Sequence, residues 1–172
     1  MHCLRVAVLP VIVSVVALPT LAQAAPPTHR IAKVVDGDTV TLTNGQRVRF
    51  VQIDTPEVHL GAECYGPAAS QVTKRLLPAG TRVRLTVEPA GDRVDQYGRL
   101  LRYVIRARDG LNVNVHLVAV GAAAPYFAHG RRGRYANRLE LFAKRARALR
   151  VGLWGVCPHT RYDPYHVVQT RR

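Results

Sequence analysis

Apolar and polar residues alternate with a period of two in five stretches of the chain, which is the pattern of half-buried β-strands. The stretches are residues 31–35, 39–42, 47–53, 83–87 and 101–105. Asn44-Gly45 lies between the second and third stretches, and both residues accept the positive φ angles of a type I′ turn. This pair therefore predicts a hairpin that joins the two strands.

Helical spacing of apolar residues predicts three helices, at about residues 67–76, 114–120 and 135–150. Pro67 suits the first turn of the first helix, and Asn114 is a good N-cap for the second. The order βββαββαα predicts an α+β protein that is mainly β, with a small five-stranded barrel and three packed helices. The OB-fold, a barrel of this size that binds oligonucleotides and oligosaccharides, is the expected architecture.

The first 24 residues have the pattern of a signal peptide. Arg5 is followed by an apolar run over residues 6–18 and by the small-residue cleavage pattern Ala22-Gln23-Ala24. A membrane anchor or a core helix is the alternative, but the run is shorter than the ~20 residues of a spanning helix, and Pro10 interrupts it. We expect export to a periplasm or secretion, with no stable membrane insertion after cleavage.

The rest of the chain is predicted to hold one domain. Residues 25–29 read as a linker, residues 30–157 as the domain, and residues 158–172 as a polar, loosely held tail. Export leaves Cys64 and Cys157, and two distant cysteines in an oxidising compartment predict one disulfide, with two free buried thiols as the alternative. Neither cysteine has a partner at zinc-ligand spacing.

The formal net charge of +14 favours a polyanionic partner, which is nucleic acid, acidic polysaccharide or anionic lipid. Compositional bias toward arginine would give the same charge without any such partner. Charge alone therefore does not decide the function.

Acidic residues gather at two predicted strand ends, in Asp36-Gly37-Asp38 and in Asp54-Thr55-Pro56-Glu57. A hairpin would bring these ends side by side, so Asp38 and Asp54 are candidate ligands of a hard cation such as Ca²⁺. The alternative is that these residues only form turns, because aspartate caps turns readily. For Asp36 we favour the turn.

Arg49, Arg99 and Glu57 are the candidate catalytic groups. A guanidinium binds phosphate oxygens bidentately, and a carboxylate that holds no metal accepts a proton from an attacking water. Arg49 and Asp54 are five residues apart, so strict alternation would place them on opposite faces of a strand. A bulge or bend near Gln52 would bring them together. Solvated charges are the alternative for each of these residues.

Five motifs in consistent order give the chain a specific resemblance. They are V-V-D-G-D-T-V (34–40), R-F-V-Q-I-D-T-P-E (49–57), Y-G-P-A-A (65–69), D-Q-Y-G-R (95–99) and G-L-W (152–154). Together they resemble the staphylococcal (thermo)nuclease family of secreted, Ca²⁺-dependent nucleases with an OB-fold. The resemblance covers about residues 31–154.

The resemblance implies roles for individual residues. Asp38, Asp54 and the carbonyl of Thr55 would bind calcium, and Arg49, Glu57 and Arg99 would form the catalytic set. Tyr97 would contact the phosphate end of the nucleotide, and Tyr126 is similar in position to the family's base- and sugar-contacting tyrosines. Gln96 departs from the family's lysine, and residues 122–133 differ in length and composition.

The expected function is that of an exported, thermonuclease-like endonuclease. It would act as a monomer on single- and double-stranded DNA and on RNA with little sequence preference, breaking the P–O5′ bond and leaving 3′-phosphates. The alternative is a non-catalytic OB-fold module that binds nucleic acid or protein, and a third possibility is a basic surface protein for acidic glycans.

Overall fold

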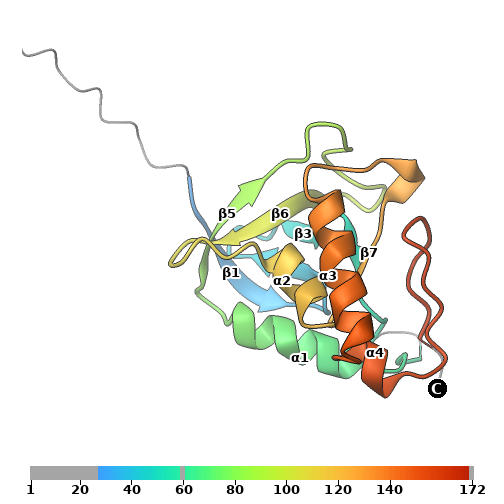
Figure 1. Cartoon of the computed structure of the whole chain (residues 1–172). Coiled ribbons are helices and arrows are strands. Elements are labelled where there is room, and N and C mark those ends of the chain that lie inside the picture. The colour runs from blue at the N-terminus through green and yellow to red at the C-terminus, as the bar shows by residue number, and fades with distance from the viewer. Residues whose placement is uncertain (1–26, 59–60, 171–172) are drawn as a thin grey trace, which may run out of the picture.

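A computed structural model describes residues 27–58 and 61–170. The predicted signal peptide at residues 1–24 lies outside the described residues. Five strands close into a barrel in the order β1-β2-β3-β6-β5 (Figure 1). Their bounds are β1 His29–Val34, β2 Thr39–Leu42, β3 Arg47–Phe50, β5 Arg82–Thr86 and β6 Leu100–Arg106. The predicted five-stranded barrel is confirmed, although β1 begins at His29, which the sequence assigned to the preceding linker.

The barrel combines antiparallel pairs with one parallel pair. β2 and β3 form the predicted hairpin, and Gly45 in its turn has a φ of 84°. β3 runs parallel to β6, with Arg49 beside Leu101. The parallel pair brings the loop before β6, which contains Arg99, to the strand that carries Arg49.

The strand predicted over residues 47–53 is two strands. β3 ends at Phe50, and β4 (Ile53–Asp54) leaves the barrel to pair with β7 (Ala124–Pro125). Between them Gln52 has a φ of 65°, a left-handed conformation that ends the extended run. The irregularity predicted near Gln52 is therefore present, and the continuous strand was wrong.

Three main helices cover the barrel, as predicted. They are α1 (Gly66–Leu76), α2 (Val113–Ala119) and α3 (Ala136–Ala148). A 3₁₀ turn at Ala128–Gly130 precedes α3, and a short helix α4 (Leu153–Val156) follows it. α1 lies under one end of the barrel, and α2 lies between the barrel and α3 (Figure 1). The second helix is capped by Asn112, whose side chain accepts from the Val115 amide, and not by Asn114 as predicted.

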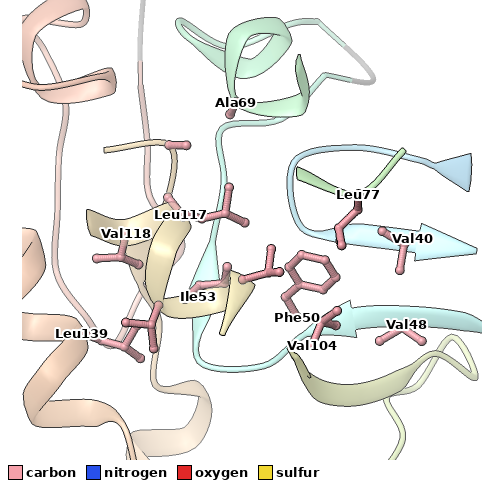
Figure 2. Packing of buried hydrophobic residues seen from close by; sticks show 14 of the residues in the cluster. Val40, Val48, Phe50, Ile53, Ala69, Leu77, Val104, Leu117, Val118 and Leu139 are labelled. Carbon is pink, nitrogen blue, oxygen red and sulfur yellow. The ribbon is translucent and has the colours of Figure 1, made fainter. Parts of the chain in front are cut away.

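One hydrophobic core joins the barrel to the helices (Figure 2). Phe50 and Ile53 flank the Gln52 bend and are both fully buried in the cluster that also contains Leu117 and Leu139. Burying a side chain of this size contributes about 1.5–3 kcal/mol each. The core therefore fixes the backbone on both sides of the bend, where the candidate site residues Arg49 and Asp54 lie.

The C-terminal segment is packed, which corrects the predicted loose tail. Cys64 and Cys157 form the predicted disulfide. Beyond it, Val168 and Thr170 are buried, and Arg161 pairs with Gln169 as an antiparallel bridge. None of the helices in residues 27–58 and 61–170 combines the length and the hydrophobicity of a membrane-spanning segment.

Candidate functional site

Two buried carboxylates meet at one guanidinium. Asp38 precedes β2 and Asp54 ends β4, and their exposed fractions are 3% and 4%. Arg49 on β3 forms an ion pair with Asp38 Oδ1 through Nη1 and a hydrogen bond of 2.6 Å to Asp54 Oδ1 through Nη2. The structure thus brings together the two aspartates and the arginine that the sequence predicted to be neighbours.

Hydrogen bonds fix the second oxygen of each carboxylate. Asp38 Oδ2 accepts from the amide and the hydroxyl of Thr55, both at 2.9 Å. Asp54 Oδ2 accepts from the amide of Val168 at 2.9 Å. Thr55 therefore positions Asp38, and the metal-ligand role predicted for its carbonyl stays a prediction. Val168 is a contact that no sequence signal indicated.

The turn before Asp38 explains its Asp-Gly-Asp sequence. Asp36 Oδ1 accepts the Asp38 amide at 3.0 Å, which confirms the turn role favoured for Asp36. A Cβ on Gly37 would overlap the side chain of Thr55. Only glycine lets the turn approach Thr55 closely enough for its hydrogen bonds to Asp38.

Glu57 lies beside the aspartate pair. It lines a recess together with Asp54, Glu63 and Val168. Burial raises the pKa of Glu57, and the negative charges of Asp54 and Asp36 raise it further. A carboxylate with a raised pKa is a better proton acceptor than an ordinary exposed glutamate.

Arg99 and Tyr97 belong to the loop before β6. Arg99 Nε donates to Asp95 Oδ2 at 2.6 Å, and its guanidinium lies 5.3 Å from the centre of the Tyr97 ring. Tyr97 is 64% exposed, which leaves its ring free to contact a ligand. The loop adjoins β3 through the β3–β6 pairing, and the direct contact predicted between Arg99 and a phosphate stays a prediction.

Tyr126 lies next to the bend at Gln52. Its amide donates to the Gln52 carbonyl at 3.0 Å, and its side chain shares a cavity with Arg49. The Gln52 side chain holds another part of the cavity lining, because its amide group donates to the Arg131 carbonyl at 2.9 Å and accepts from the Gly133 amide at 3.0 Å. The sequence indicated a bend at Gln52 but not this bridging role.

Glu88 is a second residue that sequence reasoning missed. It is buried and accepts from the Tyr103 hydroxyl at 3.0 Å and from the Arg134 amide at 2.8 Å. Together with Gln52, Glu88 holds the segment around Gly133 against the barrel. A Cβ at Gly133 would overlap the side chains of both Glu88 and Gln52. Its position at the end of a strand gave no signal of this role.

The residues fit a hard divalent cation. Among the described residues, no group of three or more histidine, cysteine or acidic side chains gathers in a metal-binding arrangement. Ca²⁺, however, accepts carboxylates together with backbone carbonyls and water. Asp38 and Asp54 supply two buried carboxylates that already share one positive charge, that of Arg49.

Comparison with known proteins identifies the family. A family model described as "Staphylococcal nuclease homologue" matches residues 47–156. The chain belongs to the staphylococcal nuclease family. The predicted resemblance is thereby confirmed.

Several proteins that are similar to this chain have nuclease names. The chain is 31% identical to a thermonuclease of Staphylococcus hyicus over 140 residues, which are 78% of this chain and 79% of that protein. It is 33% identical to endonuclease YncB of Bacillus subtilis (strain 168) and 34% identical to the SPbeta prophage-derived endonuclease YokF of the same strain. Both matches cover 71% of this chain, which spans 59% of YncB and 42% of YokF.

The match to the staphylococcal nuclease family covers most of the candidate site. It includes Arg49, Asp54, Glu57 and Arg99, whereas Asp38 lies before it. The tail that carries Val168 lies after it. The hydrogen bond between Val168 and Asp54 therefore joins the family region to a segment outside it.

Proposed function

We propose that this protein is an exported, Ca²⁺-dependent endonuclease. It hydrolyses phosphodiester bonds in single- and double-stranded DNA and in RNA, with little sequence preference, and leaves 3′-phosphate ends. The observation that carries the proposal is the meeting of Asp38, Asp54 and Arg49 beside Glu57, in a chain of the staphylococcal nuclease family.

The aspartate pair and the Thr55 carbonyl would hold the calcium ion. Asp38 and Asp54 are the carboxylate ligands, and the Thr55 amide and hydroxyl orient Asp38 from the other side. When bound, the ion neutralises charge on the scissile phosphate and polarises it toward attack.

The protein's own side chains divide the remaining chemistry. Glu57, which lines the recess with Asp54, takes the proton of the attacking water. Arg49 and Arg99 donate hydrogen bonds to the phosphoryl oxygens as negative charge grows there. Water attacks phosphorus and the P–O5′ bond breaks. The leaving 5′ oxygen takes a proton from solvent, and Glu57 returns to solvent the proton that it took from the attacking water.

Two tyrosines would bind the nucleotide. Tyr126 shares a cavity with Arg49, so a nucleotide whose phosphate reaches Arg49 has its base or sugar near Tyr126. Tyr97 is exposed beside Arg99. Gln96 is uncharged and does not attract the terminal phosphate electrostatically, so binding of that phosphate relies on Arg99.

Export and a monomeric state belong to the same proposal. The Cys64–Cys157 disulfide supports export, because disulfides persist in oxidising compartments such as the periplasm or the extracellular space. The non-catalytic OB-fold module remains the alternative function. The carboxylate pair beside Glu57 favours the enzyme, since a binding module needs no buried acidic cluster next to a polyanion.

A cleavage assay tests the proposed activity. We expect the purified protein to degrade single-stranded DNA with Ca²⁺ and to stop when a chelator is added. Glu57→Gln removes the proton acceptor with little change in shape, so cleavage should fall about 100-fold or more. Arg99→Ala should also reduce it strongly.

The matched control for Arg99→Ala is Arg108→Ala, because the Arg108 side chain is 73% exposed and pairs only loosely with Asp109. Cleavage by the Arg108→Ala variant should stay near wild type. DNA binding without chelator-sensitive cleavage would support the binding module. Unchanged cleavage in Glu57→Gln would contradict the assigned base.

A further inference from the structure

The C-terminal segment of residues 158–170, the strap hereafter, is attached to Cys64 at both ends. At its start Cys157 is bonded to the Cys64 sulfur. At its end the Cys64 amide donates to the Thr170 carbonyl at 3.1 Å, and the Thr170 hydroxyl donates to the Cys64 carbonyl at 2.7 Å. The strap therefore leaves Cys64 and returns to it as a closed loop.

Between these ends the strap runs along the side of the molecule that carries β7 (Figure 1). The Phe127 amide donates to the Pro164 carbonyl at 2.6 Å, and the rings of Phe127 and Tyr165 pack edge to face. Arg161 and Gln169 pair with each other across the loop. These contacts hold the strap in one position next to β4 and β7.

This position makes the strap a wall of the candidate site. Val167, Val168 and Gln169 line the recess that also contains Asp54 and Glu57. The Val168 side chain is 3% exposed, and its amide donates the 2.9 Å hydrogen bond to Asp54 Oδ2. Asp54 thus receives one donor from the barrel, Arg49, and one from the strap.

A hydrogen bond to the outer side of a ligating carboxylate restricts the orientations that it samples. Such outer contacts preserve metal affinity because the ligand does not have to be ordered when the metal binds, and their loss costs about 10–100-fold in affinity. The β4 strand that carries Asp54 has only two residues, so its side chain depends on contacts of this kind.

We propose that the strap is a positioning element of the calcium site, in which the Val168 amide orients Asp54. Val168 is a positioning residue that acts through Asp54. The inference rests on the proposed calcium site and deepens it, because it assigns part of the site to a segment outside the region that matches the staphylococcal nuclease family.

Calcium titration of the purified protein by calorimetry, without nucleic acid, tests the proposal. Val168→Pro removes the amide hydrogen and replaces the valine side chain with a ring. Val168→Ala keeps the amide hydrogen and loses the two buried methyl groups of valine, so it controls for lost packing. We expect Val168→Pro to weaken calcium binding by about 10-fold or more. Val168→Ala should bind within about 2-fold of wild type, since the hydrogen bond to Asp54 is retained.

A variant that ends at Thr160 keeps both cysteines and loses residues 161–170 of the strap, including Val168, so it serves as the second variant. It should show the same loss of affinity, and cleavage should recover at high calcium concentration in both deficient variants because Glu57 and Arg49 are unaltered. Circular dichroism and thermal melting identify any variant that is unfolded. The calcium affinities of the folded variants then test the role of the strap.

The outcomes separate this inference from the proposed function. Calcium binding by wild type with equal or tighter binding by Val168→Pro or by the truncated chain would overturn the role of the strap alone. Equal weakening in Val168→Ala and Val168→Pro would also overturn it, since packing and not the amide would be responsible. No calcium binding by wild type would overturn the proposed metal site, and the strap's role with it.

Discussion

At the scale of single residues, Gln52 determines how the site is assembled. Its φ of 65° is unfavourable for a residue with a side chain, by about 1–2 kcal/mol. The side-chain hydrogen bonds to Arg131 and Gly133 offset that cost. Because the bend interrupts alternation, Arg49 and Asp54 reach each other although they are five residues apart.

Asn114 shows how one buried amide joins several elements. Its Oδ1 accepts from the Val104 amide at 2.9 Å, and its Nδ2 donates to the carbonyls of Val51 and Arg102. It lies inside α2, whereas the capping oxygen belongs to Asn112. Asn114 therefore connects α2 to β6 and to the start of the Gln52 bend.

These different roles predict different effects on stability. Asn114→Ala removes the partner of the Val104 amide and of the Val51 carbonyl, whereas the Arg102 carbonyl still accepts from the Val51 amide. The change should lower the free energy of unfolding by about 2 kcal/mol or more. Asn112→Ala removes one capping acceptor and should lower it by about 1 kcal/mol. Urea unfolding of the two variants measures the difference. A larger loss for Asn112→Ala would contradict the assignment of the cap.

At the scale of elements, α2 and α4 meet through two glycines. The Leu153 amide donates to the Gly121 carbonyl at 2.9 Å. Gly152 has a φ of 61°, and a Cβ there would overlap the Gly121 carbonyl. This close approach explains the glycine of the G-L-W motif, and it places Cys157, which follows α4, within reach of Cys64.

Gly152→Ala is expected to be strongly destabilising, because both the positive φ and the overlap with Gly121 oppose a methyl group. We predict a loss of about 3 kcal/mol or more in the free energy of unfolding. Gly45→Ala is the matched control: its φ is 84°, but the described chain places nothing within 4 Å of a Cβ there. It should cost about 1 kcal/mol.

Thermal or urea unfolding compares the two glycine variants. Equal losses would show that backbone strain alone accounts for both. The close approach of α2 and α4 would then contribute little to stability.

At the scale of the whole molecule, positive charge dominates the surface chemistry. The chain has 25 lysines and arginines against 11 acidic residues. Two of those acidic residues, Asp38 and Asp54, are buried beside Arg49 and contribute little repulsion toward a polyanion. Several of the other acidic residues, such as Asp109 and Glu140, form ion pairs with arginines away from the site. The excess of positive charge is therefore available to attract a polyanion.

This charge predicts binding that depends on salt. In the presence of a chelator, which prevents cleavage, affinity for single-stranded DNA should fall steeply as salt rises, with a slope of about −0.7 per phosphate contact in a plot of log affinity against log salt. Fluorescence anisotropy measures it. A peptide nucleic acid of the same sequence, which has no phosphates, should not bind. Affinity independent of salt would contradict an electrostatic interface.

Local sequence patterns predicted the barrel and its hairpin, which the fold confirms, and they singled out the acidic and basic residues that the fold brings together at Arg49. These features depend on local patterns: period-two alternation, the Asn44-Gly45 turn and short motifs around Asp38, Asp54 and Glu57. The family match confirms the motif-based interpretation. These patterns can be recognised in a sequence because apolar residues recur with the period of the strand or helix whose face is buried.

Tertiary structure alone decided which polar groups are partners. Val168 and Asp54 are 114 residues apart, and Gln52 and Gly133 are 81 apart. A lone valine or glutamine has no local pattern that indicates such a contact, because the contact exists only after the core has set the distances between elements. For the same reason the sequence predicted a loosely held tail. In the fold, the buried residues of that tail pack against the site.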